Sequence, residues 1–187
     1  MTTQVNIPFS VKSHQEDGFF CGYASVFDVT DHHQEVVARQ AFAVSLAKWR
    51  EKGRMPKMLW QHDQRKPIGI WEEIYEDEHG LYVKGRLLLE LQAGRDAYAL
   101  MKAGVIDSMS IGFRPIKATR DGTKKTRVLT EVDLLEISLV TFAANPDAKV
   151  TAVKEFDLDD EIIRQIKELG EMLKARRLTQ ERNSLYV

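Results

Sequence analysis

Hydrolysis by a serine nucleophile needs a hydroxyl, a base that accepts its proton, and a group that orients the base. Histidine is the usual base because its pKa lies near neutrality. Among the five histidines, His62 stands out because it follows the apolar stretch Met58–Trp60 at the end of an expected strand. We predict that His62 is either a catalytic base or a partly buried structural histidine. The other four lie in polar segments or turns: His14, His32, His33 and His79.

Ser108 and Ser110 are the candidate hydroxyls. They lie in the strand-like stretch 106–116 and share one face of it, because alternate residues of a strand point the same way. Met109 and Ile111 occupy the opposite face. Small hydroxyls on a strand face are usually structural, so these two serines need further support before they indicate catalysis.

Glu136 lies in an otherwise aliphatic strand-like stretch, Leu134–Val140. Acidic side chains are rarely placed among aliphatic ones unless they are paired. A hairpin that turns about Asp121-Gly122 pairs residues whose numbers sum to about 245. Ser110 then lies opposite Leu135 or Glu136, and a strand glutamate beside a strand serine suggests a histidine partner. A bulge would shift this register by one residue and turn Glu136 to the opposite face.

The elements that must position these side chains are mostly short strands, and they predict a mainly β fold with peripheral helices. Irregular spacing between the strands favours a small closed β-barrel ringed by helices over a doubly wound sheet. We expect helices over 39–49 and 92–103, with Gly104 ending the second. Expected strands cover residues 3–12, 18–29, 58–62, 68–75, 81–89, 106–116 and 127–142.

The end of the chain has a different pattern, and we predict a barrel domain over 1–153 and a C-terminal amphipathic helix or tail over 154–187. Acidic residues crowd the start of this segment and basic residues crowd its end, as suits a helix dipole. The helix either folds back on the barrel or serves as a docking or oligomer helix. Its apolar residues recur at helical spacing: Leu158, Ile162, Ile166, Leu169 and Leu173.

Composition excludes several classes of protein. The 187 residues carry 27 basic and 28 acidic side chains, a balance that argues against a dedicated nucleic-acid binder. No apolar run reaches the roughly 18 residues of a membrane helix, and we expect no secretory signal at the start. Cys21 is the single cysteine, which favours a reducing compartment. His32 and His33 lack the spaced partners of a metal site, so we expect no metal and no cofactor.

Several motifs, taken together and in order, resemble the prohead maturation proteases of tailed phages. The resemblance covers about residues 15–150. That family is similar in turn to herpesvirus assemblin, a serine protease on a closed β-barrel ringed by helices. The motifs are Gly22–Phe27, Ala41-Phe42, Leu59–Asp63 with Pro67–Gly69, Gly80–Gly85, Ser108–Phe113, and Leu135–Thr141 with Ala144–Pro146.

The resemblance implies roles for the candidate residues. His62 would be the general base, Ser110 the nucleophile with Ser108 as the alternative, and Glu136 the group that orients His62. The herpesvirus relatives carry a second histidine where this chain has Glu136, but a carboxylate can fix the imidazole tautomer and stabilise the imidazolium. Backbone N–H groups after the last strand would bind an oxyanion, with Ala143, Ala144 and Asn145 as candidates.

The implied function is a serine endopeptidase of phage capsid maturation. It would cleave scaffold segments of the major capsid protein, and itself, inside the prohead in the host bacterial cytoplasm. The expected partner is the major capsid protein with its scaffold segment; self-association is open, and no nucleic-acid or membrane partner is expected. Two alternatives remain: a catalytically silent scaffold protein on the same barrel, and a small-ligand-binding barrel in which His62 and Glu136 merely satisfy each other.

Overall fold

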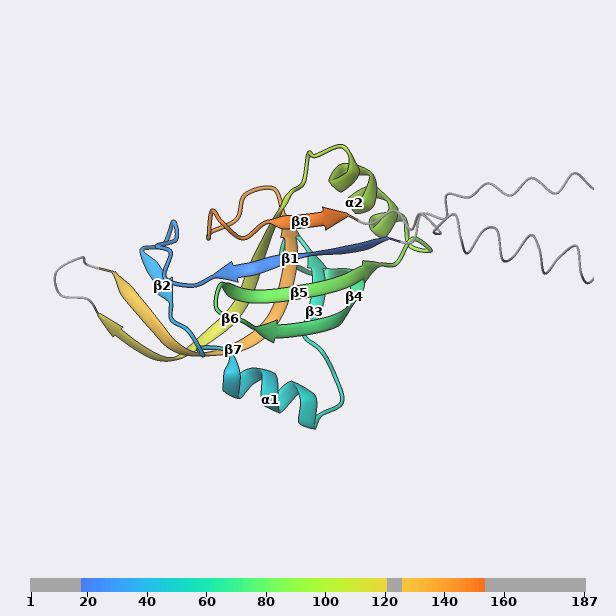
Figure 1. Cartoon of the computed structure of the whole chain (residues 1–187). Coiled ribbons are helices and arrows are strands. Elements are labelled where there is room, and N and C mark those ends of the chain that lie inside the picture. Colours follow the sequence, from blue (N-terminus) through green and yellow to red (C-terminus); the bar gives the residue numbers. More distant parts are fainter. Residues whose placement is uncertain (1–17, 121–125, 154–187) are drawn as a thin grey trace, which may run out of the picture. The chain divides into compact units, whose positions relative to one another are not determined.

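The computed structural model describes residues 18–120 and 126–153, which fold around one curled β-sheet with two helices (Figure 1). The expected segments 3–12 and 154–187 lie outside the described residues, so the division at residue 153 stays a prediction. The elements are β1 (Phe19–Val26), β2 (Glu35–Val37), α1 (Ala43–Glu51), β3 (Lys57–Trp60), β4 (Asp63–Glu76), β5 (Gly80–Leu87), α2 (Gln92–Lys102), β6 (Ser108–Arg120), β7 (Arg127–Val140) and β8 (Val150–Val153).

The strands form one sheet in the order β2-β7-β3-β4-β5-β1-β8, with β6 pairing along the other edge of β7. Most pairs are antiparallel, whereas β2 and β3 run parallel to β7. The two ends of the sheet meet at a single bridge between Ser108 and Lys149. The predicted mainly β fold is therefore confirmed, and the expected closed barrel takes the form of a curled sheet joined by a short bridge.

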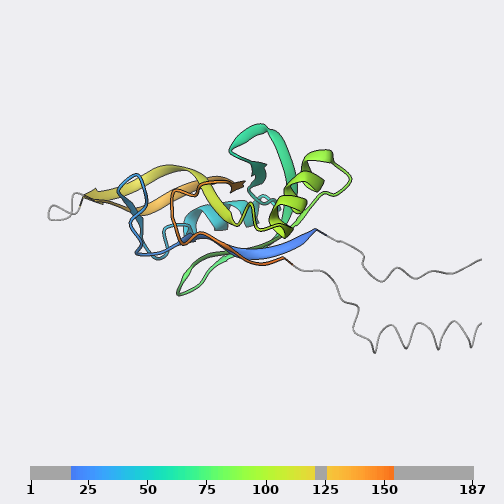
Figure 2. The ribbon, with the colours of Figure 1, turned by 90° about the horizontal axis from the view of Figure 1, so that it is seen from above.

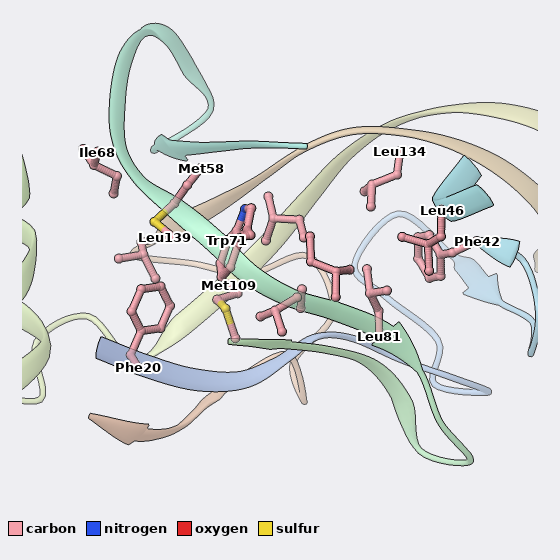
Figure 3. Close-up of a cluster of buried hydrophobic side chains, with 14 of the residues drawn as sticks. Phe20, Phe42, Leu46, Met58, Ile68, Trp71, Leu81, Met109, Leu134 and Leu139 are labelled. Atoms are coloured by element: carbon pink, nitrogen blue, oxygen red, sulfur yellow. The ribbon is translucent and has the colours of Figure 1, made fainter. Parts of the chain in front are cut away.

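The core fills the inside of this curl (Figure 3). Phe20 of β1 meets the edge of the Trp71 ring, with ring centroids 5.6 Å apart. Apolar burial of this extent is the main stabilising contribution to the fold. The fully buried large side chains come from six of the eight strands and from the segment before α1: Phe20, Phe42, Met58, Ile68, Leu81, Val83, Leu87, Met109, Leu129, Leu134, Ile137 and Leu139.

The two helices pack against the sheet and add side chains to its core. Ser45 and Trp49 of α1 bind the backbone of Leu134: the Ser45 hydroxyl accepts its N–H at 2.9 Å, and the Trp49 ring N–H donates to its C=O at 2.8 Å. These contacts fix the middle of β7, the strand that carries Glu136. Helix α2 ends before Gly104, whose positive φ of 69° is the expected left-handed stop. No helix in residues 18–120 or 126–153 is long and apolar enough to cross a membrane.

The β6–β7 hairpin has a different register from the expected one. Ser110 pairs with Ser138, and Gly112 pairs with Glu136, so paired numbers sum to 248 rather than about 245. The prediction that Ser110 lies opposite Leu135 or Glu136 is wrong, because the pairing slips by two residues relative to Glu136. An even slip keeps the same face, so Glu136 and Ser110 still project from one side of the hairpin. The distal half of this ribbon projects beyond the rest of the sheet in both views (Figures 1 and 2).

Candidate active site

His62 lies in a tight turn that rests against β7. Trp60 pairs with Asp63, so Gln61 and His62 form a two-residue hairpin loop, and both have left-handed backbone, with φ of 52° and 59°. Two successive positive φ angles are the signature of the turn that suits a twisted hairpin. The His62 N–H donates to the Ser138 hydroxyl at 3.1 Å. The turn thus brings His62 against Ser138 of β7, the residue that pairs with Ser110 of β6.

Glu136 contacts this imidazole directly. Its Oε1 lies 2.6 Å from His62 Nδ1, and its Oε2 accepts the Ser138 hydroxyl proton at 2.6 Å. The hydrogen bond that His62 donates to Glu136 raises the pKa of His62, although partial burial opposes the rise. With Nδ1–H donating to the carboxylate, Nε2 is the nitrogen left to act on a substrate or nucleophile.

Gly112 makes room for the Glu136 carboxylate. The two residues are directly paired across the hairpin, and a Cβ atom at Gly112 would overlap the Glu136 carboxylate. Any side chain at Gly112 must therefore push Glu136 away from its place beside His62. This gives a physical reason for the glycine in the Ser-Ile-Gly-Phe motif.

Ser110 and His62 line the same cleft, which has a volume of about 290 Å³. Strands β3 and β6 flank β7, so Ser138 pairs with Leu59 on one side and with Ser110 on the other. Ser110 is 9% exposed, and within the described ranges its hydroxyl makes no hydrogen bond, to His62 or to any other group. The cleft is lined by Ala24, Ser25, Val29, Asp31, His33, Glu35, Val37, His62, Ser110, Ile111, Gly112, Phe113, Ala144 and Asn145.

The other two serines of β6 and β7, Ser108 and Ser138, are engaged elsewhere. Ser108 is buried, donates to Asp107 at 2.7 Å and accepts from Lys149 at 2.9 Å, and it does not line the cleft. Ser138 is fully buried, and its hydroxyl donates a hydrogen bond to Glu136. Of Ser108, Ser110 and Ser138, it is therefore Ser110 that lines the cleft and has a hydroxyl without a hydrogen bond to another described residue.

The loop after β7 meets the cleft at two of the three expected positions. Ala144 and Asn145 line it, whereas Ala143 packs into a small apolar cluster with Val140 and Ala148. The Asn145 side-chain amide donates to the Val26 C=O at 2.8 Å and ties this loop to β1. The loop can thus present backbone N–H groups to a substrate from a fixed position.

Sequence reasoning assigned no supporting role to two residues at this site, Ser138 and Gln61. Ser138 holds both the His62 backbone and the Glu136 carboxylate, and its signal was present in the Glu-x-Ser spacing, since i and i+2 share a strand face. Gln61 had no such signal, because its partner lies 80 positions away. In the described parts of the chain, no three histidine, cysteine or carboxylate side chains cluster as a metal site would require.

Comparison with known proteins places this chain in a family. The model of the family described as caudovirus prohead serine protease matches residues 7–161. The chain belongs to that family. The resemblance stated from the motifs is therefore confirmed.

The chain is similar to two curated proteins named prohead protease. The prohead protease of Enterobacteria phage HK97 is 35% identical to this chain over 144 residues, and the prohead protease of Escherichia phage T5 is 30% identical over 107 residues. These alignments cover 76% and 56% of this chain, which spans 63% and 49% of the two relatives. Among solved structures, the bacteriophage T4 capsid assembly protease aligns with a TM-score of 0.53 at 12% identity. That alignment covers 65% of this chain and 82% of the T4 chain, and it shows a shared fold.

Proposed function

We propose that this chain is a serine endopeptidase of phage capsid maturation, with Ser110 as nucleophile, His62 as general base and Glu136 as the group that orients His62. The observation that carries the proposal is the 2.6 Å contact between His62 Nδ1 and Glu136 Oε1, at a cleft that also holds the uncommitted Ser110. Membership of the prohead protease family supports the same conclusion.

The reaction is an acyl transfer in two halves. His62 Nε2 takes the proton of Ser110 Oγ as this oxygen attacks the scissile carbonyl carbon, and Glu136 stabilises the resulting imidazolium. Backbone N–H groups of Ala144 and Asn145 would bind the oxyanion. The imidazolium then protonates the leaving amine, which departs and leaves a serine ester. Water, deprotonated by His62, attacks the ester, and the proton returns to Ser110.

The substrate peptide would lie along the outer edge of β6. The Met109 N–H donates to the Ala148 C=O, away from β7, so alternation directs the backbone groups of Ile111 the same way. Ile111 lines the cleft, and beyond Met109 the outer edge of β6 pairs with no other strand of the described chain. An extended peptide can therefore add to this edge as a strand, with its carbonyl beside Ser110.

The proposed substrates are scaffold segments of the major capsid protein and the protease itself, cleaved inside the prohead. Support comes from the relatives, which are named for the prohead and for capsid assembly. A catalytically silent scaffold protein is the alternative, and the intact set of His62, Ser110 and Glu136 argues against it.

Co-expression with the cognate major capsid protein tests the proposal. Intact mass should show a truncated capsid protein with the wild-type chain and with Ser108→Ala, but not with Ser110→Ala. Ser108→Ala is the matched control, because Ser108 is buried outside the cleft. Truncation by Ser110→Ala would remove Ser110 from the mechanism. Assembled particles without truncation by the wild type would favour the silent scaffold.

A further inference from the structure

Gln61 joins the His62 turn to the loop that follows β7. Its side-chain amide donates to the Thr141 hydroxyl at 2.8 Å, and the Thr141 backbone N–H donates back to the Gln61 amide oxygen at 3.2 Å. The Gln61 backbone N–H adds a third bond, to the Leu139 C=O at 3.0 Å. Three hydrogen bonds therefore tie one turn residue to the end of β7.

Both segments joined in this way need external support. Gln61 and His62 hold left-handed backbone that residues with side chains rarely adopt, and such conformations persist when surrounding contacts fix them. The loop beyond Thr141 gains little from packing at its start, because Phe142 is 90% exposed. Polar contacts hold the loop instead: Gln61 at Thr141, the His32 N–H on the Ala144 C=O, and the Asn145 amide on Val26.

We propose that Gln61 and Thr141 are positioning residues, whose paired hydrogen bonds align the His62 imidazole with the oxyanion-binding loop 141–145. The inference rests on the proposed roles of His62 and Ser110. Neither Gln61 nor Thr141 lines the cleft, so they act through the residues beside them. Loss of the pair lets the turn and the loop shift independently, and small misplacements of catalytic groups reduce rates strongly.

The test measures how fast a biotinylated alkyl fluorophosphonate labels Ser110 in the full-length chain, by intact mass and peptide mapping across pH. Gln61→Ala and Thr141→Val should each slow labelling about tenfold or more, and the double variant should be no slower than either single one. Thr141→Ser, which keeps the hydroxyl, should recover most of the rate. Gln92→Ala is the matched control, since the Gln92 side chain also makes two hydrogen bonds, to Asp96 and Arg95, outside the cleft.

The pH profile separates positioning from general stability. Labelling requires neutral His62, so its midpoint follows the His62 pKa, which Glu136 raises above the ordinary value. Gln61→Ala should move the midpoint downward, as the ring leaves Glu136. If Gln61→Ala and Thr141→Val label Ser110 at the wild-type rate and with the wild-type pH midpoint, the positioning role is overturned. If Gln61→Ala does not fold, the result for Thr141→Val decides the question. Labelling of Ser110→Ala at the wild-type rate would instead refute the proposed function.

Discussion

At the residue scale, the site depends on a carboxylate whose two oxygens have separate tasks. Glu136 Oε1 accepts a hydrogen bond from the His62 ring, and Oε2 accepts one from the Ser138 hydroxyl. The Ser138 hydroxyl in turn accepts the His62 backbone N–H. Ring, carboxylate and turn are therefore fixed relative to one another before a substrate arrives. Such fixed geometry is what allows a carboxylate to hold one imidazole tautomer and to favour its protonated form.

Glu136→Gln should lower both the activity and the His62 pKa. The neutral amide no longer stabilises the imidazolium, so we expect Ser110 labelling to slow about 100-fold or more. Because the wild-type contact raises the His62 pKa, the midpoint of the rate against pH should fall in the variant. NMR titration of the ring and labelling rates measure the two effects. Asp63→Asn is the control, since Asp63 binds Arg65 and should leave both values unchanged.

The same contact predicts how stability depends on pH. His62 has a higher pKa in the folded chain than in the unfolded chain, so the native state binds the proton more tightly. The contribution of the pair is complete below the ordinary value of 6.5 and is lost as pH rises through the folded pKa. Since the imidazole is half exposed, solvent screening keeps this contribution small.

Gly112→Ala should inactivate the site without unfolding the sheet. The added methyl group overlaps the Glu136 carboxylate, which must swing away from His62. We expect a loss of labelling close to that of Glu136→Gln, together with a fall in the His62 pKa, while the Tm changes little. Thermal unfolding and NMR titration check both statements. A variant that labels Ser110 at the wild-type rate would show that Glu136 does not need the space beside Gly112.

At the element scale, the sequence predicted the position and type of most helices and strands but not how the strands pair. Strand-forming residues and turn residues located β1, β5 and the two arms of the β6–β7 hairpin, and helical spacing located α2. The register failed because the ladder already pairs Arg120 with Arg127, whose numbers sum to 247, and three register shifts then bring the sum to 248 at Ser110. Local pattern marks neither the first pair of the ladder nor the bulges. The sequence left open whether Ser110 and Glu136 share a face, and the pairing of Ser110 with Ser138 places them on the same one.

The features that the sequence did not predict depend on contacts between segments that lie far apart in the chain. Strand β8 is four residues long and follows the Asn145-Pro146 break, so nothing local distinguishes it from a loop. The bonds of Gln61 to Thr141 and of Ser45 to Leu134 span 80 and 89 positions. Side chains of this kind look like ordinary polar surface residues until the fold brings their partners to them.

Helix α1 offers a prediction about a half-buried acid. Glu76 of β4 accepts the backbone N–H of Phe42, the residue that caps α1, at 3.1 Å. Burial raises the pKa of Glu76, although the hydrogen bond from Phe42 opposes the rise. The folded chain therefore binds this proton more tightly than the unfolded chain, and stability falls as pH rises from 4.5 through the folded value.

Glu76→Gln should raise the Tm at neutral pH. The amide oxygen still accepts the Phe42 N–H, but no buried charge forms, so the gain should vanish in acid where the wild-type carboxyl is protonated. Thermal unfolding from pH 3 to pH 8 measures this difference. Glu73→Gln provides the comparison, because Glu73 is exposed and bound to Lys84, and it should not raise the Tm. A Glu76→Gln chain less stable at pH 7 would show that the helix requires the charge.

At the scale of the whole molecule, Lys149 joins the two ends of the curled sheet. Its C=O accepts the Tyr23 N–H of β1, and its ammonium group binds both oxygens of Asp107, at 3.0 and 2.9 Å, and the Ser108 hydroxyl at 2.9 Å. The hydrogen bond from Ser108 and the charge of Lys149 lower the pKa of Asp107. Because β6 begins at Ser108, these contacts of Lys149 fix the position of Ser110 relative to the loop that carries Ala144 and Asn145.

Lys149→Met should therefore affect chemistry more than stability. The ion pair is largely exposed, so we expect its loss to cost up to about 1 kcal/mol. However, the contacts of Lys149 lie between the proposed nucleophile and the oxyanion-binding loop. Their loss should misalign the two, so labelling of Ser110 should slow about threefold or more. Lys117→Met is the matched control: Lys117 binds Glu131 on the projecting part of the β6–β7 ribbon, away from the cleft. If both variants label alike, the bridge between the sheet ends only supports the fold, and the alignment of Ser110 with the loop comes from the core alone.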